Sequence, residues 1–258
     1  MNALILAAGR GTRIHSVHGG HPKCLIRFDG SKSTILDHQI DGLFSAGVAK
    51  IGIVVGYEKD QIIRHVIKNY QDEQDRFHFI ENPAFATTNN ICSFWLARTW
   101  LNREPFVCLN ADVVFDPRIL IPAVQSVAPI TMVVDPKWRD ETMKVVISQD
   151  RVIRMSKRIP QSEFSGTYIG VTAFSADVQE RLFAKVNNLI RTGNENEFFN
   201  VAVQQLADEG IRVGFTTTGD LPWTEIDDPG DLEFRATPCF PKADFAPGCG
   251  IVRAWTTF

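Results

Sequence analysis

The stretch that decides the fold is Ala3-Leu4-Ile5-Leu6-Ala7-Ala8-Gly9-Arg10-Gly11-Thr12-Arg13, followed by Pro22-Lys23-Cys24-Leu25. It begins with an apolar run that is typical of a buried β-strand. The run ends in small residues, where the backbone can approach a ligand with no side chain between them. The sequence therefore predicts a strand that delivers a glycine-containing turn to the surface of the protein.

Positive charge gathers around this turn. Residues 1–28 hold four Lys or Arg, at positions 10, 13, 23 and 27, and no Asp or Glu. A turn lined by backbone N–H groups with concentrated positive charge suits a polyphosphate. The alternative is an ordinary strand-to-loop junction with solvated basic side chains, and spacing and charge alone leave both open.

The composition narrows the class of protein. The chain has 258 residues, of which 44% are hydrophobic and 22% charged, as expected for one globular α/β domain. A net charge of −3 provides no general basic field for nucleic acid. Five cysteines without C-x-x-C spacing predict reduced thiols in a cytoplasmic protein. No apolar run reaches the roughly 18 residues of a membrane span, and Met1 leads into the first strand rather than into a signal peptide.

The first half of the chain predicts alternating strands and helices. We expect helices over about 35–46, 58–70 and 89–100, and strands over 50–55, 77–80 and 106–109. This alternation indicates an α/β fold, a Rossmann-like, mostly parallel sheet with helices on both faces. Ligands of such sheets bind at the carboxyl ends of the strands, where Gly9, Gly56 and Asp112 are expected.

The second half is less regular. We expect strands over 130–134, 167–174 and 211–217, a hairpin of 144–147 and 152–155 around Gln149-Asp150, and helices over about 176–190 and 197–209. Residues 223–227 are expected to be extended, and Asp228-Pro229 to start a helix. We interpret 1–236 as one domain and the proline-containing residues 237–258 as a tail that could pack on the body or on a partner subunit.

Three acidic residues are candidate metal ligands. Asp112 follows an apolar strand, and a carboxylate at a strand terminus is a natural ligand for Mg²⁺, which prefers oxygen donors. Glu225 and Asp227 alternate, so an extended backbone places both side chains on one face. The alternatives are a polar residue that opens a turn, for Asp112, and a solvated strand edge, for the other two.

Two further groups have weaker functional interpretations. His15, His18 and His21 recur at every third position and could indicate zinc, although a phosphate-closing loop is the better interpretation. The tryptophans at 95, 100, 138 and 223 could form a cage for a quaternary ammonium group. Trp95 and Trp100 lie in an apolar helix, which favours a place in the core.

The opening motif resembles the signature of nucleotidyltransferases that activate sugar phosphates and related small phosphates, in which G-x-G-T-R is followed by P-K-x-L. The resemblance implies that the first loop wraps a nucleoside triphosphate, and that Arg13 and Lys23 are catalytic because they stabilise the triphosphate and the leaving pyrophosphate. It also implies Mg²⁺ on Asp112, Glu225 and Asp227. The residues expected to bind nucleotide are Leu6, Ala7, Ala8, Gly9, Arg10, Gly11, Thr12, Arg13, Lys23, Gly56, Asn90 and Ala111.

A second motif narrows the branch. Residues 89–97, Asn-Asn-Ile-Cys-Ser-Phe-Trp-Leu-Ala, resemble the N-N-I-x-S-x-x-L-A stretch of phosphocholine and phosphonate cytidylyltransferases. Glu225 and Asp227 resemble an acidic motif of the phosphocholine branch. Asp112-Val113-Val114 departs from the D-x-D of related glycosyltransferases and favours nucleotidyl transfer. The chain also leaves no room for the long repeat domain of many sugar-nucleotide enzymes, so CTP is the expected nucleotide.

The acceptor is expected to be a small phosphate or phosphonate, bound by an insertion over about 135–209. Residues 137–158 carry seven Lys or Arg and three acids, 7 − 3 = +4. Such a field favours a phosphonate or phosphate with a further carboxylate over phosphocholine. We therefore name Lys144, Lys157 and Glu197 as acceptor-binding candidates; a solvated hairpin is the alternative.

The predicted reaction is attack of an acceptor oxygen on the α-phosphorus, with release of pyrophosphate. A sugar-1-phosphate enzyme that uses UTP or dTTP, or a non-catalytic nucleotide sensor, stays an alternative. A dinucleotide-binding oxidoreductase is disfavoured, because its third glycine would fall at Ile14 and the second strand ends without an acid, in Val54-Val55-Gly56. We expect no nucleic-acid or membrane partner, and a homodimer is an open prediction.

Overall fold

The computed structural model describes residues 1–14, 19–27, 33–227 and 231. The predicted helix at Asp228-Pro229, the tail 237–258, and His15 and His18 lie outside the described residues. Among the described residues, no helix is long and apolar enough to cross a membrane.

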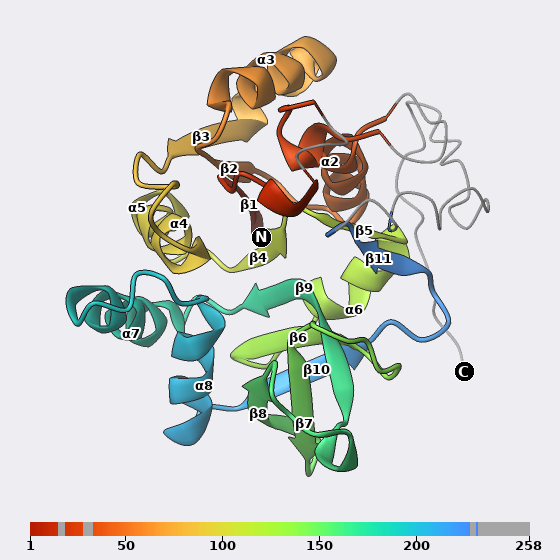
Figure 1. Ribbon diagram of the computed structural model, residues 1–258, viewed down its shortest axis with the longest axis vertical. Helices are drawn as coiled ribbons and strands as arrows, with labels where there is room; N and C mark the ends of the chain where they lie inside the picture. Colours follow the sequence, from red (N-terminus) through yellow and green to blue (C-terminus); the bar gives the residue numbers. More distant parts are fainter. Residues whose placement is uncertain (15–18, 28–32, 228–230, 232–258) are drawn as a thin grey trace, which may run out of the picture.

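The predicted α/β fold is confirmed. A sheet runs in the order β10-β6-β9-β4-β1-β2-β3, and β1, β2, β3 and β4 pair in parallel. The strands of this parallel part are β1 (Asn2–Ala7), β2 (Ile51–Val55), β3 (Phe77–Glu81) and β4 (Phe106–Asn110). Its helices are α2 (Ile35–Ser45), α3 (Lys59–Asn69), α4 (Asn90–Leu96) and α5 (Arg98–Leu101). They occupy the upper half of the molecule in Figure 1.

Alternation along β1 builds a core on each face of the sheet. Leu4 and Leu6 belong to the core that also holds Phe94 of α4, whereas Ala3 and Ile5 belong to the core packed against α2 and α3. Successive side chains of a strand point to opposite faces, so one apolar run serves both cores. The first strand lies inside the sheet, between β4 and β2.

The second half extends the sheet and adds a hairpin (Figure 1). β9 (Gly166–Phe174) runs antiparallel to β4 and to β6 (Ile130–Asp135), and β10 (Val213–Thr217) is parallel to β6. β7 (Lys144–Ser148) and β8 (Arg151–Ser156) form the predicted hairpin. Its turn residues Gln149 and Asp150 have φ of 48° and 63°, the left-handed pair that a tight hairpin turn requires. The helices here are α6 (Leu120–Val124), α7 (Gln179–Arg191) and α8 (Asn200–Asp208).

Several predicted boundaries are wrong. The helix expected over 89–100 breaks at Ala97 into α4 and α5. The helix expected from Glu197 begins at Asn200, so Phe198 precedes it and is half-buried. Residues 223–225 form β11 (Trp223–Glu225), which pairs antiparallel with β5 (Val113–Phe115) in a separate two-stranded sheet. Short 3₁₀ turns cover Thr12–Ile14, Lys23–Leu25, Gln71–Arg76, Pro117–Ile119 and Gln161–Glu163.

Candidate active site

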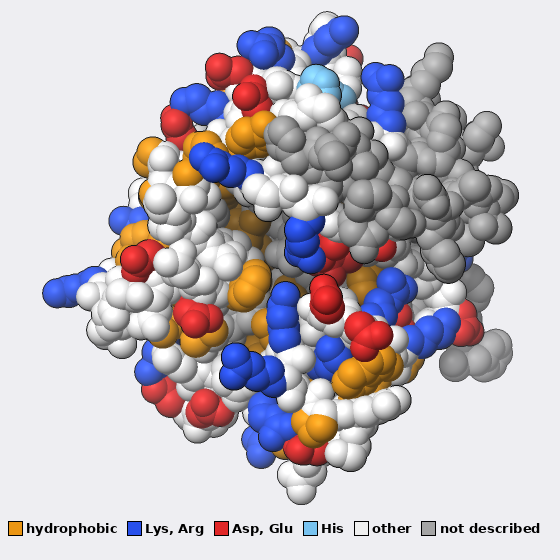
Figure 2. All heavy atoms as spheres, in the orientation of Figure 1, with side chains coloured by type: hydrophobic (Ala, Val, Ile, Leu, Met, Phe, Trp, Pro, Cys, Tyr) orange, Lys and Arg blue, Asp and Glu red, His pale blue; other side chains and the backbone are white. Residues whose placement is uncertain are grey.

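A cavity of about 360 Å³ lies at the carboxyl ends of β1 and β4. In the space-filling view, basic and acidic side chains meet around a hollow near the centre of this face (Figure 2). Residues from both halves of the chain line the cavity, including the first loop, the β4–β5 turn and the segment before α8. The cavity therefore lies at the carboxyl ends of the strands, where the sequence analysis expected a ligand to bind.

The first loop forms one wall of the cavity. Leu6, Ala7, Ala8, Gly9, Gly11, Thr12 and Arg13 all line it. A Cβ on Gly9 would have open space around it, so this glycine is not required by packing. Gly11 has φ of 59°, a left-handed conformation that favours glycine. The loop can therefore bend sharply and present its backbone to the cavity.

Two predicted nucleotide-binding residues lie elsewhere. Gly56 does not line the cavity, and a Cβ there would come within 2.8 Å of the Ala8 carbonyl oxygen and 2.7 Å of the Phe85 Cβ. Its glycine is needed because β2 passes directly beneath the loop, where Tyr57 N–H donates to the Ala8 carbonyl oxygen at 3.0 Å. Arg10 is also outside the lining and holds its guanidinium 5.6 Å from the centre of the Phe85 ring.

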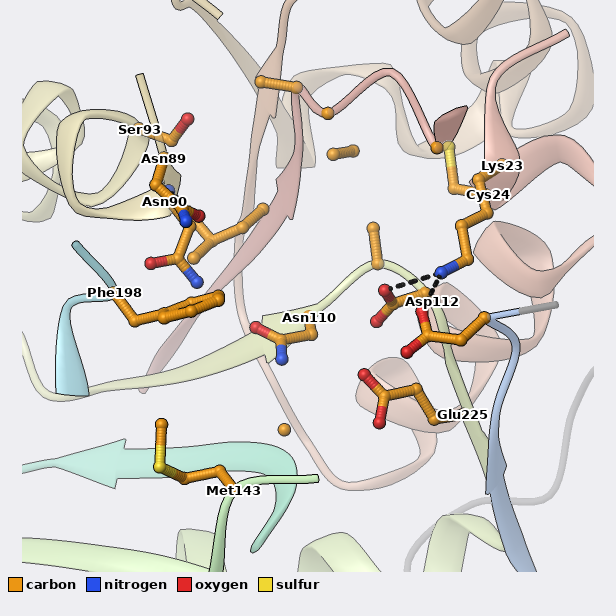
Figure 3. Close-up of a pocket in the computed structure, with 18 of the residues that line it drawn as sticks. Lys23, Cys24, Asn89, Asn90, Ser93, Asn110, Asp112, Met143, Phe198 and Glu225 are labelled. Atoms are coloured by element: carbon orange, nitrogen blue, oxygen red, sulfur yellow. Dashed lines mark hydrogen bonds and ion pairs between the residues drawn. The ribbon is translucent and has the colours of Figure 1, made fainter. Parts of the chain in front are cut away.

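Lys23 bridges two carboxylates. Its Nζ donates to Asp112 Oδ2 at 2.9 Å, a contact that Figure 3 marks with a dashed line, and to Asp227 Oδ1 at 2.7 Å. Arg13, at the rim of the cavity, holds its Nη2 3.2 Å from Asp227 Oδ2. Burial alone would lower the pKa of Lys23, but the two carboxylates outweigh it and raise that pKa. Burial likewise opposes ionisation of Asp227, yet the Lys23 charge holds the pKa of Asp227 below its usual value. Lys23 is thus firmly cationic.

Strand pairing brings the three acids together. Glu225 of β11 stands opposite Val113 of β5, and the Ile226 N–H donates to the Asp112 carbonyl oxygen at 2.9 Å. Asp112, Glu225 and Asp227 can each offer one oxygen within 4.8 Å of the others. The pairing of β11 with β5 therefore brings Glu225 and Asp227 to Asp112, beyond the carboxyl end of β4.

The acidic cluster has a deficit of positive charge. Asp112 Oδ1 is buried and has no hydrogen-bond partner among the described residues. Burial, together with the charges of Asp112 and Asp227, raises the pKa of Glu225 to about 8. A divalent cation would relieve both features, because it takes hard oxygen ligands and favours ionised carboxylates. The residues present therefore fit a divalent metal ion.

The opposite end of the cavity is lined by side-chain amides, a hydroxyl and an aromatic ring. Figure 3 shows Asn89, Asn90, Ser93 and Phe198 across the cavity from Lys23, Asp112 and Glu225. Asn90 Oδ1 accepts from the Phe199 N–H at 3.0 Å, and so ties α4 to the segment before α8. The cavity thus has a charged end and an amide-rich end.

Some lining residues were missed from the sequence. They include Asn82, Phe85, Ser93, Asn110, Tyr168 and Asn200. Ser93 carried a signal, because it stands in the N-N-I-x-S motif, and its hydroxyl accepts from Asn82 Nδ2 at 3.0 Å. Asn82 follows β3, and Phe198 precedes α8. Their role in the cavity depends on how the two halves of the chain meet.

The acceptor-binding candidates separate. Lys157 lines the cavity, with its Nζ 5.3 Å from the centre of the Phe198 ring. Lys144 and Glu197 do not line it. Glu197 is exposed, and Lys144 is only 3% exposed because its stem is covered and its Nζ donates to the Thr142 carbonyl oxygen. Of these three residues, the structure brings only Lys157 to the cavity.

The aromatic cage and the histidine cluster find no support among the described residues. The four tryptophans contact different partners: Trp95 with Arg98, Trp100 with His78, Trp138 with Lys144 and Trp223 with Arg139. None of the four lines the cavity. His21 is hydrogen-bonded to Gln61 at 2.7 Å, and the other two histidines lie outside the described residues.

The sequence of the chain matches a known protein family. Residues 3–167 match the model of the MobA-like NTP transferase domain, which is more than half of the sequence. The protein therefore belongs to this family of nucleotidyltransferases.

Individual relatives share most of the chain. CTP:phosphoglutamine cytidylyltransferase of Campylobacter jejuni is 28% identical over an alignment of 260 positions that covers 91% of this chain and 99% of that protein. 2-Aminoethylphosphonate cytidylyltransferase of Lancefieldella rimae is 30% identical over an alignment of 210 positions that covers 78% of each chain. The solved structure of inositol-1-phosphate CTP transferase from T. maritima superimposes with a TM-score of 0.75 at 26% identity, covering 90% of this chain and 91% of that one.

Proposed function

We propose that the protein is a cytidylyltransferase that transfers CMP from CTP to a small phosphate or phosphonate and releases pyrophosphate. The observation that carries this proposal is the Lys23 ammonium held between Asp112 and Asp227 beside the glycine-containing loop. The similarity to proteins named as cytidylyltransferases supports the choice of CTP.

In this proposal the triphosphate lies against the first loop, between Arg13 and Lys23. Backbone N–H groups and these two cations would oppose its negative charge. The base would then reach the amide-rich end of the cavity. Asn90 Oδ1 already accepts the hydrogen bond from the Phe199 N–H, and Asn90 Nδ2 makes no hydrogen bond to any described residue. That amide group can donate to O2 or N3 of cytosine, which are acceptors.

The chemistry asks the protein mainly for alignment and charge. The second pKa of a phosphate is about 6, so a phosphate acceptor is largely a dianion near neutral pH. Its attacking oxygen therefore needs no general base. An acceptor oxygen attacks the α-phosphorus, the bond to the β-phosphate oxygen breaks, and pyrophosphate leaves with that electron pair. Lys23 would neutralise charge on the phosphates as the leaving group departs. Cys24 also lines the cavity, but burial raises its pKa to about 12, so a neutral thiol offers no competing nucleophile.

A divalent cation, most simply Mg²⁺, would be held by Asp112, Asp227 and Glu225. When bound, such an ion supplies charge neutralisation for phosphate oxygens. The buried, unpaired Asp112 Oδ1 and the raised pKa of Glu225 support this assignment. We expect chelation with EDTA to abolish turnover and Mg²⁺ to restore it; full turnover in EDTA would remove the three acids from this role.

We further propose that residues of the 135–209 segment bind the acceptor. Met143 and Phe198 face the cavity from this segment (Figure 3), and Lys157 adds a cation next to Phe198. An acceptor with a second anionic group would gain from that cation, whereas a choline or amino group would be repelled. An acidic phosphonate or phosphate is therefore the preferred acceptor in this proposal.

The test is a pyrophosphate-release screen of CTP, UTP, dTTP, ATP and GTP. Each nucleotide is paired with phosphocholine, 2-aminoethylphosphonate, phosphono- and phospho-carboxylates, and sugar 1-phosphates. We expect CTP with an acidic acceptor to react fastest, with a CMP conjugate confirmed by mass spectrometry. Fastest turnover of sugar 1-phosphates with UTP or dTTP would overturn the cytidylyltransferase proposal, and nucleotide binding without pyrophosphate release would indicate a sensor.

A further inference from the structure

Gln39 is a fully buried polar residue on a helix face that is otherwise apolar. It lies on α2, where Leu36, Ile40 and Leu43 enter the core. A buried side-chain amide is costly unless its polar atoms are hydrogen-bonded. The partners of Gln39 therefore show why an amide stands at this position.

Both N–H groups of the Gln39 amide serve the turn that carries Asp112. Nε2 donates to the Asn110 carbonyl oxygen at 2.8 Å and to the Val113 carbonyl oxygen at 2.8 Å. These two carbonyls lie on either side of Ala111-Asp112, so one side chain closes the turn across its whole width. Gln39 Oε1, in contrast, is buried, and no residue that the structure describes forms a hydrogen bond with it. Leaving this buried oxygen without a hydrogen bond costs free energy, and the geometry that leaves it so is the one in which both N–H groups of the amide bind the turn.

The turn needs such support because the chain changes sheets there. β4 belongs to the main sheet and β5 to the two-stranded sheet with β11, so no single strand ladder fixes both sides of Asp112. The same helix also contacts the segment after Lys23, since the Ile35 N–H donates to the Ile26 carbonyl oxygen at 3.0 Å. Helix α2 therefore connects the backbone near Lys23 with the backbone of Asp112.

We propose that Gln39 is a positioning residue that fixes the Asp112 carboxylate relative to Lys23 and to the candidate metal ligands. This inference rests on the proposed function, because it matters only where Asp112 takes part in binding a cation and phosphate. Groups that orient metal ligands typically affect metal affinity or activity by about 10–100-fold.

The test replaces Gln39 by Met, which keeps the length of the side chain and removes both donors. The matched control is Gln179→Met, because Gln179 is also buried and its Nε2 donates to a single backbone carbonyl, that of Glu104, away from the cavity. Both variants are compared with the wild-type protein by thermal unfolding, by calorimetric titration with Mn²⁺, and by kcat and KM for CTP.

We expect Gln39→Met to weaken Mn²⁺ binding and to lower kcat, each by about tenfold or more, with little change in the KM for CTP. Gln179→Met should lose comparable thermal stability and keep both properties. If Gln39→Met binds Mn²⁺ and turns over like Gln179→Met, the positioning role is wrong. Should Gln39→Met fail to fold, Gln39→Asn, whose shorter amide cannot span both carbonyls, decides by the same criteria.

Asp112→Asn separates this inference from the proposed function. If Asp112→Asn binds Mn²⁺ as well as wild type does, the proposed metal role of Asp112 fails, whatever Gln39 does. If Asp112→Asn loses Mn²⁺ and Gln39→Met does not, the proposed function stands and the inference about Gln39 is overturned. Loss of Mn²⁺ in both variants, with retention in Gln179→Met, supports the inference.

Discussion

Two regions of the molecule are rich in Lys and Arg, and they use that charge differently. In residues 9–27 two of the four cations converge, because Lys23 and Arg13 both face Asp227 at the cavity, whereas Arg10 lies outside the cavity lining. In residues 137–158 the cations scatter: Arg154 pairs with Glu163, and Arg139 lies 4.0 Å from the Trp223 ring. Lys157 lines the cavity from this second region. A count of charges therefore does not place them; the direction of each side chain does.

The largest effect is expected where the first region converges. Lys23→Ala and Asp112→Ala should each lower kcat by about 10²–10³-fold, because each removes a preorganised electrostatic contact. The measurement is pyrophosphate release, with circular dichroism to show that the fold is intact. Near-wild-type rates in either folded variant would remove the difference between the two regions, since the converging charges would then have no catalytic weight.

The second region should matter through a single cation. Lys157→Ala is expected to lower kcat/KM for an acidic acceptor by about tenfold, because a charge-assisted contact contributes about 1.5–3 kcal/mol. The matched control is Arg154→Ala, an exposed cation of the same hairpin whose partner is Glu163. Equal losses in both variants would mean that the hairpin acts through its general field; no loss in Lys157→Ala would make it surface only.

Lys144 should contribute to stability instead of binding. Its ammonium lies 4.6 Å from the Trp138 ring and is bonded to the Thr142 carbonyl oxygen. Lys144→Ala should lower the free energy of unfolding by about 1–2 kcal/mol, through the lost ring contact and hydrogen bond. Denaturant unfolding measures this change. A marked loss of acceptor affinity in the folded variant would restore Lys144 as a binding residue.

The smallest effect concerns how the buried Asp37–His65 pair and the exposed Arg154–Glu163 pair respond to acid. Burial would raise the pKa of Asp37, but the hydrogen bond from His65 and those from Thr34 outweigh burial and lower it below 3.8. A folded-state pKa below the unfolded value stabilises the protein above about pH 4 and loses that contribution as pH falls through the folded pKa.

The measurement is the Tm of wild type and Asp37→Asn between pH 7 and pH 3. We expect the variant to be less stable near neutral pH and the gap to narrow on acidification. Glu163→Gln, which breaks the exposed pair with Arg154, should change Tm little at any pH, because surface pairs contribute little. A constant gap for Asp37→Asn would show that its effect is not electrostatic.

Local chemistry explains how far prediction from sequence reached. The apolar run of β1, the glycine-containing turn and the hairpin at Gln149-Asp150 depend on neighbouring residues, and all three are present. The predicted helix ends were less accurate, because tertiary contacts decide where a helix starts and stops. The Phe199 N–H donates to Asn90 Oδ1, and α8 starts at the next residue, Asn200. Lys144 and Glu197 could not be placed, because nothing near them in sequence reports which way they point.

The sequence by itself determined the α/β fold and the first loop, because a strand, its turn and the residues that follow are encoded within a short stretch. The candidate roles of Lys23 and Asp112 came from the resemblance of its motifs to those of nucleotidyltransferases. Only the tertiary structure decided that β11 pairs with β5, so that Glu225 and Asp227 join Asp112. It also decided that Gln39 closes the Asp112 turn. Those arrangements depend on contacts between residues far apart in the chain, and no local pattern specifies them.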